Sequence, residues 1–375
     1  MHLRRALLPL AFVSVGSLLA AGCGGDDDAG DSATTTAAAP TTAATSDSTA
    51  APDTVAGSDT TAADGSTPSG GDPLSFVLLI GGPATDGGFY QAMVDGLQEA
   101  AEADGDIDVE VRDNLATGGD ASLENAVREA ASSGDFDLVV AHGFDLVPAV
   151  AKFAPEFPDQ KFATSLPVEG SPENVEVYLS VFEEIGYNAG FLAAQGTTAG
   201  KIGFIGGPGA DFEKQAEAGF KQAVEDYAPD AEVTAVYTGT FEDPQLAQEA
   251  ATQMIGDGID SIWNQQAAGQ SGVYTACAAA PEVNCFGNSV YSEAVNPDVV
   301  LASSVSDYKI LLPLWAERLR GDSWEVGPDM LSISNGGTTV SDATAAGQEK
   351  LPELQAAIDQ YLADSEAGKI EVAAG

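Results

Sequence analysis

Positive charge is the scarcest property of this 375-residue chain. Only 14 Lys and Arg residues stand against 58 Asp and Glu residues, so the formal net charge is −44 at pH 7. Because proteins bind nucleic acid mainly by neutralising its phosphates with Lys and Arg, this imbalance excludes nucleic acid as a partner. A strongly acidic surface by itself says little more about function.

Histidine and cysteine are too few to build a metal centre. Beyond residue 23 the chain has one histidine, His142, and two cysteines, Cys277 and Cys285. No cluster of possible ligands accompanies them, so we expect no bound metal. The two cysteines bracket a short loop that contains a proline, and outside the cytoplasm this spacing favours a local disulfide. Two free thiols are the alternative.

Cofactor and nucleophile motifs are absent as well. Two glycine-rich turns, residues 81–83 and 206–209, follow predicted strands, but neither has the third glycine of a dinucleotide-binding turn. Arg112 and Tyr237 stand where an acidic residue would hold a ribose. No Gly-x-Ser-x-Gly elbow follows a strand. We therefore expect no cofactor and no enzyme activity, although an enzyme that uses carboxylates alone remains an alternative.

The first 23 residues have the order of a secretory signal. Arg4 and Arg5 precede an uncharged apolar run over 6–21, which is too short for a comfortable transmembrane span. Small residues then lead to Cys23, which resembles the acylated cysteine of a bacterial lipobox. Residues 1–23 are therefore predicted to be a lipoprotein signal peptide, with the mature protein anchored on the extracytoplasmic face of the cell membrane. A simple cleaved signal is the alternative.

Residues 24–73 are almost entirely Gly, Asp, Ala, Thr and Ser, and they contain no aromatic residue, Lys or Arg. Such a segment cannot bury enough apolar surface to offset its ordering entropy. We predict a disordered tether that holds the folded part away from the membrane.

The remaining 300 or so residues exceed what one hydrophobic core usually supports, so two domains are expected. Two segments begin alike, because the strands 76–80 and 201–205 each run into a glycine-rich turn and a helix, over 89–103 and 213–227. Other predicted strands are 107–112, 138–141, 162–165, 175–180, 232–237, 261–264, 284–287 and 299–304. Other predicted helices are 123–132, 147–153, 244–255 and 272–280. This alternation predicts an α/β fold with two doubly wound parallel sheets, one in each lobe.

Several blocks of sequence resemble the basic membrane protein (Bmp) family, which are substrate-binding lipoproteins of ABC transporters, many of them binding purine nucleosides or related purines. In chain order the blocks are 82–91 (GPATDGGFYQ), 157–162 (FPDQKF), 181–190 (VFEEIGYNAG), 201–207 (KIGFIGG), 217–220 (EAGF), 238–244 (TGTFEDP) and 267–272 (AAGQSG). The resemblance implies a type I periplasmic-binding-protein fold, in which two lobes joined by a hinge close over a small-molecule ligand. It also implies an ABC permease as partner. We expect a monomer.

We place the three chain crossings between lobes near 194–199, near 303–307 and close to the C-terminus. Lobe 1 then comprises residues 74–195 plus 304–375, and lobe 2 comprises residues 196–303. Since doubly wound sheets bind ligands outside the carboxyl ends of their strands, the cleft between the lobes is the expected site.

Candidate ligand contacts follow the predicted strands of both lobes. Phe89 and Phe241, one from each lobe, would stack on the two faces of a flat heterocycle, or else pack in the core. The Asp86 carboxylate would accept hydrogen bonds from a purine, cap the following helix, or do both. Tyr90 and Gln91 belong to the same turn.

Four further candidates carry alternatives of their own. His142 would bind the ligand or serve a structural role, and Phe144 would line the cleft wall. Gln265 and Gln266 would present amides to the ligand or hold a loop together. Trp263 is expected in the core.

The family pattern breaks at two places. Asn288 and its neighbours replace the aspartate that holds the ribose in nucleoside-binding members, and Ser306 and Asp307 replace a family lysine. Asn288 and Asp307 are themselves expected to contact the ligand. These changes remove groups directed at a ribose, so a free purine base or a ligand of another class stays open. The rival functions are a sugar or signalling-molecule receptor, an extracytoplasmic enzyme that acts on nucleosides, and a sensory or adhesive lipoprotein with a degenerate cleft.

Overall fold

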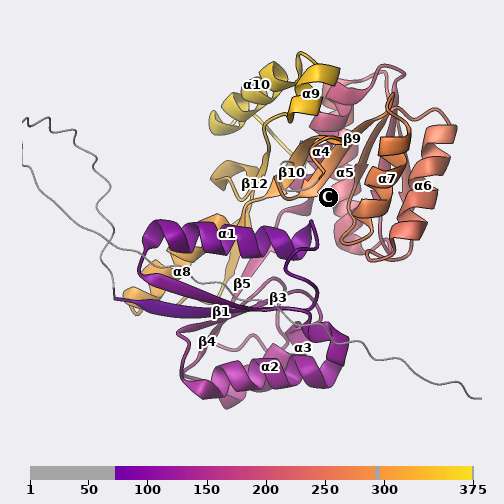
Figure 1. Ribbon diagram of the computed structural model, residues 1–375. Helices are drawn as coiled ribbons and strands as arrows, with labels where there is room; N and C mark the ends of the chain where they lie inside the picture. The colour runs from indigo at the N-terminus through magenta and orange to yellow at the C-terminus, as the bar shows by residue number, and fades with distance from the viewer. Residues whose placement is uncertain (1–71, 292–295, 374–375) are drawn as a thin grey trace, which may run out of the picture. The chain divides into compact units, whose positions relative to one another are not determined.

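The computed structural model describes residues 72–291 and 296–373, which form two parallel sheets with helices on both faces (Figure 1). The predicted signal peptide, the acylated Cys23 and nearly all of the predicted tether lie outside the described residues. None of the helices in the described ranges combines the length and the apolar character needed to cross a membrane.

The first sheet has six strands in the order β11-β5-β4-β3-β1-β2, all parallel. Its strands are β1 (Leu74–Ile80), β2 (Ile107–Arg112), β3 (Leu138–His142), β4 (Lys161–Thr164), β5 (Val175–Ser180) and β11 (Pro328–Leu331). Its helices are α1 (Phe89–Asp104), α2 (Asp120–Ser133), α3 (Val147–Phe153) and α8 (Leu311–Arg320), with 3₁₀ turns η1 (Leu115–Gly118), η2 (Ala154–Glu156) and η4 (Tyr308–Ile310).

The apolar runs of this sheet are continuous because both faces are covered. In β1, Phe76 and Leu78 pack with α1 and α8, whereas Val77 and Leu79 pack with α2 and α3. Figure 1 shows α1 and α2 on opposite faces of this sheet. All four side chains are fully buried.

The second sheet has the order β12-β10-β9-β8-β6-β7, and only β12 is antiparallel to its neighbour. Its strands are β6 (Lys201–Gly206), β7 (Glu232–Tyr237), β8 (Ser261–Asn264), β9 (Asn284–Ser289), β10 (Val300–Ser306) and β12 (Thr338–Val340). Its helices are α4 (Phe182–Gly196), α5 (Asp211–Tyr227), α6 (Pro244–Gly256), α7 (Gln270–Ala279), α9 (Ala345–Lys350) and α10 (Leu354–Glu366), with the 3₁₀ turn η5 (Ile333–Asn335) before β12. Trp263 lies in the core between this sheet and its helices, as predicted.

The predicted boundary at residue 195 is wrong, because α4 packs on the second sheet. Gly186 and Gly219 let α4 and α5 approach closely: a Cβ on Gly186 would stand 1.8 Å from the carbonyl oxygen of Ala216, and one on Gly219 would stand 1.8 Å from that of Glu183. Ile185 and Phe191 of α4 belong to the core of the second lobe. The first crossing therefore falls between β5 and α4.

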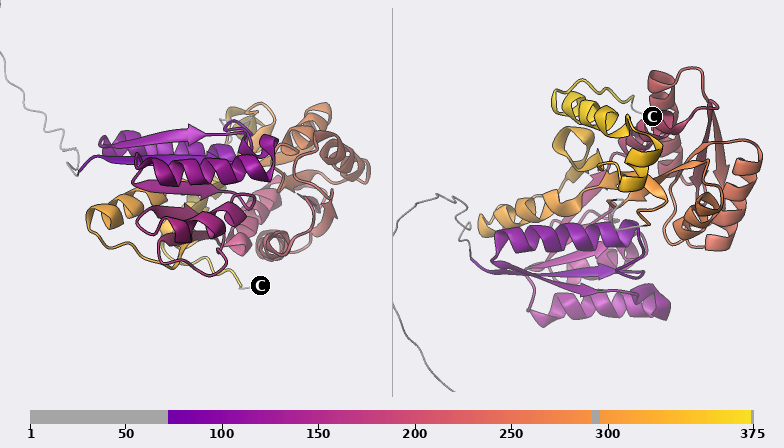
Figure 2. Two further views of the ribbon diagram at one scale, coloured as in Figure 1. Left: turned by 90° about the horizontal axis from the view of Figure 1, so that it is seen from below. Right: turned by 45° about the horizontal axis from the view of Figure 1, so that its top comes forward.

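The C-terminal part of the chain is divided between the lobes. After the second crossing, which lies near residue 307 as predicted, η4, α8 and β11 join the first lobe. A third crossing between β11 and β12 returns the chain to the second lobe, where Leu354, Ile358 and Tyr361 of α10 pack against α4 and α5. The helices α9 and α10, drawn in yellow, lie beside the second sheet in Figures 1 and 2. Residues 304–375 are thus not a single lobe 1 segment.

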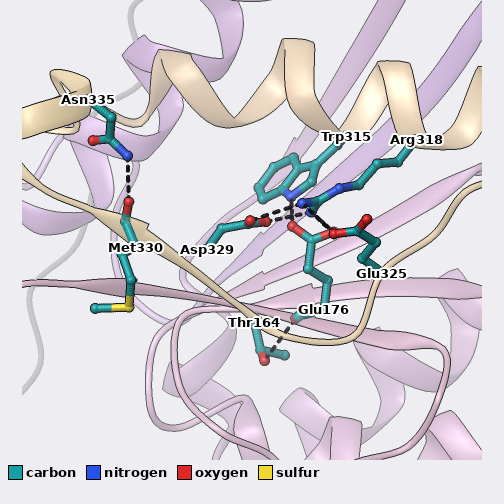
Figure 3. A network of polar contacts seen from close by, with 8 residues as sticks. All are labelled: Thr164, Glu176, Trp315, Arg318, Glu325, Asp329, Met330 and Asn335. Carbon is teal, nitrogen blue, oxygen red and sulfur yellow. Dashed lines mark hydrogen bonds and ion pairs between the residues drawn. The ribbon is translucent and has the colours of Figure 1, made fainter.

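A buried ionic network fastens α8 and β11 to the first sheet (Figure 3). Arg318 of α8 donates to both carboxylate oxygens of Asp329, at 2.5 and 3.0 Å. Its Nη1 also lies 2.8 Å from Oε2 of the fully buried Glu176. This contact is an ion pair without the geometry of a hydrogen bond. Trp315 Nε1 donates to Glu176 Oε1 at 2.5 Å. Burial, followed by the contact with Asp329, raises the pKa of Glu176 to about 8.

Cys277 at the end of α7 and Cys285 in β9 form a disulfide. The bond closes the short connection between this helix and the next strand, as the spacing of the two cysteines predicted.

Candidate ligand site

The turn between β1 and α1 is held by side chains of its own. Asp86 accepts hydrogen bonds from three backbone N–H groups: those of Gly88 at 2.9 Å, Tyr90 at 3.2 Å and Gln91 at 3.0 Å. Gln91 Oε1 accepts from the N–H of Gly87 at 3.1 Å. Asp86 and Gln91 therefore hold the start of α1 in place. For Asp86 this is the helix-capping role that the sequence predicted.

Phe89 lies on His142 inside the first lobe. The two rings are stacked, with centroids 3.9 Å apart and an interplanar angle of 22°. His142 Nε2 donates to the carbonyl oxygen of Phe89 at 3.2 Å, so Nδ1 accepts from the Tyr178 hydroxyl at 2.8 Å. Both ring nitrogens are thus used within the lobe. The side chain therefore supports Phe89, as the structural alternative for His142 predicted, and a contact of His142 with the ligand stays a prediction.

Acid should destabilise the protein through His142. Burial lowers the pKa of this fully buried imidazole to about 3, so between pH 6.5 and pH 3 the unfolded chain binds a proton that the folded chain does not. Its contribution to the free energy of unfolding is complete above pH 6.5 and falls by up to about 1.4 kcal/mol per pH unit below that. Urea denaturation between pH 7 and pH 4 should show the wild type converging on His142→Gln; a constant difference would contradict this assignment.

Phe241 lies in the second lobe, in the loop just after β7. Its half-buried ring is stacked on Phe212 with centroids 5.9 Å apart. A Cβ on Gly207 would stand 2.4 Å from this ring, so the glycine-rich turn after β6 makes room for an aromatic side chain. The Phe241 carbonyl oxygen accepts from the N–H groups of Ala267 at 3.1 Å and Gly269 at 2.9 Å, which ties this loop to the one after β8.

The backbone N–H groups of the second glycine-rich turn are occupied by a carboxylate. Glu213, fully buried in the first turn of α5, accepts from Gly207, and it accepts from Gly209 and Ala210 at 2.8 Å each. In both lobes, therefore, an acidic side chain binds the amides that would cradle a phosphate in a dinucleotide-binding turn. The sequence analysis did not identify this role of Glu213.

Gln265 and Gln266 follow β8 and are almost fully buried. Gln266 Nε2 donates to the Thr238 hydroxyl oxygen at 3.3 Å, and that hydroxyl donates its own proton to the Thr240 carbonyl at 2.6 Å. Because the Thr238 hydroxyl gives its proton to Thr240, it accepts from Gln266, so Nε2 and not Oε1 of the Gln266 amide faces Thr238. Within residues 72–291 and 296–373, Oε1 of Gln265 and Oε1 of Gln266 have no hydrogen-bond partner. A buried acceptor without a partner is costly, so these oxygens are available to a donor on a ligand.

The two lobes meet at these loops. Gln270 Nε2, at the start of α7, donates to the carbonyl oxygen of Gly87 at 2.6 Å. The Gln266 carbonyl oxygen accepts from Asn288 Nδ2 at 3.4 Å and lies 3.8 Å from the position of a Cβ on Gly88. The structure thus brings the turn before Phe89 together with Gln266 and Asn288. Gln270 was missed as an individual residue, although it lies in the block 267–272 that carried the family resemblance.

The remaining candidates have other environments. The Tyr90 ring packs over Gly82, where a Cβ would stand 2.6 Å from it, and burial raises the pKa of its hydroxyl. Phe144 is 71% exposed, so its ring lines no buried surface. Asp307 caps η4 by accepting from the N–H of Lys309 at 3.2 Å, and it lies 3.0 Å from the Nζ of the same lysine. In the described ranges, no group of His, Cys, Asp and Glu side chains is arranged to hold a metal ion.

A model of the Bmp family, described as ABC transporter substrate-binding protein PnrA-like, matches residues 74–365. The chain belongs to this family. The Bmp model covers both sheets and the interlobe loops, so the resemblance seen in the short blocks is confirmed over most of the described residues.

Two curated relatives of this Bmp chain carry names that state a ligand. A purine-binding protein of Brucella abortus is 26% identical over 232 residues, 62% of this chain and 64% of the relative. The ABC transporter nucleoside-binding protein BmpA of Lactococcus lactis is 28% identical over 163 residues, 44% of this chain and 46% of the relative. The chain spans about half the length of the curated relatives it matches.

Among solved structures, an ABC transporter solute-binding protein from Conexibacter woesei superposes with a TM-score of 0.67. The two sequences are 28% identical, and the superposition covers 80% of this chain and 99% of the Conexibacter chain. The predicted fold class, with two parallel-sheet lobes of the periplasmic-binding-protein type, is confirmed.

Proposed function

We propose that this protein is the ligand-capturing subunit of an ABC importer and that it binds a purine base or nucleoside between its two lobes. The family and the names of the Brucella and Lactococcus relatives support this proposal. The observation that carries it is the meeting of the loops after β1 and β8, with a half-buried phenylalanine available from each lobe.

The two phenylalanines supply the apolar part of the proposed site. Phe89 is held on His142 in the first lobe, and Phe241 is held on Phe212 in the second. A flat purine between the rings would bury both of its faces, and each stacked face contributes about 1–3 kcal/mol. Closure of the lobes around the purine then favours the liganded state, because only the closed form makes both contacts.

The polar part of the proposed site comes from the second lobe. The free Oε1 atoms of Gln265 and Gln266 are acceptors for ring N–H or amino groups, which purines carry on their edges. Asn288, 6% exposed, sits beside the Gln266 carbonyl and completes the polar wall.

The proposed ligand carries no phosphate. Asp86 takes amides at the start of α1, and Glu213 takes those of the turn after β6, so a phosphate brought to either place would meet a carboxylate. Bases and nucleosides fit these turns, whereas nucleotides are repelled.

The protein acts, in this proposal, without catalysis. It is exported, acylated at Cys23 and held at the extracytoplasmic face of the membrane, where it delivers its ligand to a permease. Incubation with inosine or adenosine followed by chromatography tests the alternative. Release of free base in proportion to the protein present would identify an enzyme.

Calorimetric titration of the full protein tests the ligand class. We expect saturable one-to-one binding of at least one of adenosine, inosine, guanosine and their free bases, with adenosine 5′-monophosphate bound at least about tenfold more weakly than adenosine. Glucose, galactose, amino acids and short peptides serve as controls and should give no heat of binding. Binding of a sugar or an amino acid, with none of any purine, would refute the proposal.

A further inference from the structure

Gln270 joins the two lobes at the turn that precedes Phe89. It is the first residue of α7 in the second lobe and is 2% exposed. Its Nε2 donates to the carbonyl oxygen of Gly87, in the first lobe, at 2.6 Å. Because its donor and its acceptor belong to different lobes, this part-buried hydrogen bond exists only while the two lobes are in contact.

A second hydrogen bond sets the orientation of the amide. Gln270 Oε1 accepts from the Tyr274 hydroxyl at 2.8 Å, four residues further along the same helix. Burial raises the pKa of Tyr274 to about 12, so the hydroxyl keeps its proton and remains a donor. Because the Gly87 carbonyl can only accept, reversing the amide would break the hydrogen bond to Gly87 and set two oxygens against each other.

The first lobe presents Gly87 from a rigid turn. Asp86 binds the N–H groups that follow it, and Gln91 binds the N–H of Gly87 itself. Gly88 leaves the space that Gln270 needs, since a Cβ there would stand 2.8 Å from Nε2. Phe89 follows Gly88 directly in the chain. The position of its ring therefore depends on the turn to which Gln270 is hydrogen-bonded.

We propose that Gln270 is a positioning residue that couples closure of the lobes to the placement of Phe89 against the ligand. This inference rests on the proposed function, because it assigns Gln270 to the ligand-bound, closed form. Losing the interlobe hydrogen bond lowers the population of the closed form. The apparent affinity for the ligand falls by the same factor.

The substitution Gln270→Glu tests the coupling with little change of shape. It keeps an acceptor for Tyr274, removes the donor to Gly87 and places a carboxylate against a carbonyl oxygen. By calorimetry we expect adenosine to bind about 10- to 50-fold more weakly than to the wild type. Gln253→Glu, on the exposed face of α6 in the same lobe, is the matched control and should bind within about twofold of the wild type. Equal affinities for the wild type and Gln270→Glu would overturn the inference.

Hydrogen–deuterium exchange without ligand separates this inference from the proposed function. If Gln270 joins the lobes, Gln270→Glu should speed exchange in both segments, 86–91 and 266–272, although they belong to different lobes. Faster exchange in 266–272 alone would mean a local role and would overturn the inference. Should the wild type bind no purine, the proposed function fails, while the exchange pattern still decides the role of Gln270.

Discussion

Replacing Phe89 or Phe241 by alanine is expected to weaken purine binding by about ten- to a hundredfold for each ring, since a stacked base face contributes about 1–3 kcal/mol. The rings come from different lobes, so their losses should combine, and the double variant should bind about a hundred- to ten-thousandfold more weakly. Calorimetry with adenosine or its free base measures these changes.

An exposed aromatic ring that is no candidate ligand contact offers a control for these variants. Tyr227, the last residue of α5, is 40% exposed, so Tyr227→Leu should change the affinity by less than about twofold. Because Phe89 also packs on His142, Phe89→Leu is needed beside the alanine variant, as it keeps much of the apolar contact and removes the aromatic face. Wild-type affinity in both Phe89→Leu and Phe241→Ala would mean that the ligand is not held between these rings.

The substitution Arg318→Met should strongly destabilise the first lobe. It removes the cation that pairs with the Asp329 carboxylate, and it leaves that carboxylate beside Glu176, which has no exposure to water and, with its pKa raised to about 8, is mostly protonated at neutral pH. Breaking a buried ion pair from one side typically lowers the free energy of unfolding by about 3–5 kcal/mol. Urea denaturation followed by tryptophan fluorescence is a suitable measurement, since Trp315 belongs to the same network.

Lys152→Met is the control for this prediction. Lys152 pairs with Glu124 at 2.5 Å, but both side chains are largely in water, so its loss should cost at most about 1 kcal/mol. Equal destabilisation by Arg318→Met and Lys152→Met would show that the network in Figure 3 does not hold α8 and β11 on the sheet.

The sheets could be predicted from the sequence because their central strands are buried on both faces, whereas the edge strands β2 and β7 alternate apolar and polar residues. Runs such as those of β1 and β6 are continuously apolar and end in glycine-rich turns, and the strands predicted over 107–112, 175–180, 232–237 and 261–264 match β2, β5, β7 and β8 in full. Local composition decides such elements, so little information from elsewhere in the chain is needed.

The lobe boundaries could not be predicted in the same way. The strands β11 and β12 have only four and three residues and carry no alternating pattern, so their sheets are decided by distant partners. For β11 these partners are β5 and the network around Arg318. The helix α4 was given to the wrong lobe because the close approach of Gly186 to α5 cannot be read from residues 182–196 alone.

The candidate site was predicted in outline, and the roles of individual residues differ. An acid before a helix and a histidine after a buried strand suit either a ligand or the fold, and the structure assigns hydrogen bonds of Asp86 and His142 to the fold. Nothing local distinguishes Gln270 from the other glutamines of its loop. Its role depends on a carbonyl oxygen 183 residues away.

Native mass spectrometry after incubation with a mixture of possible ligands shows which class of small molecule the protein binds. The mixture contains equal concentrations of purine bases, purine nucleosides, sugars and amino acids, and the full protein selects among them. We expect each chain to retain one purine base or nucleoside, and Gln270→Glu to retain less of it. Retention of a sugar or an amino acid in its place, or of no compound at all, would refute purine capture.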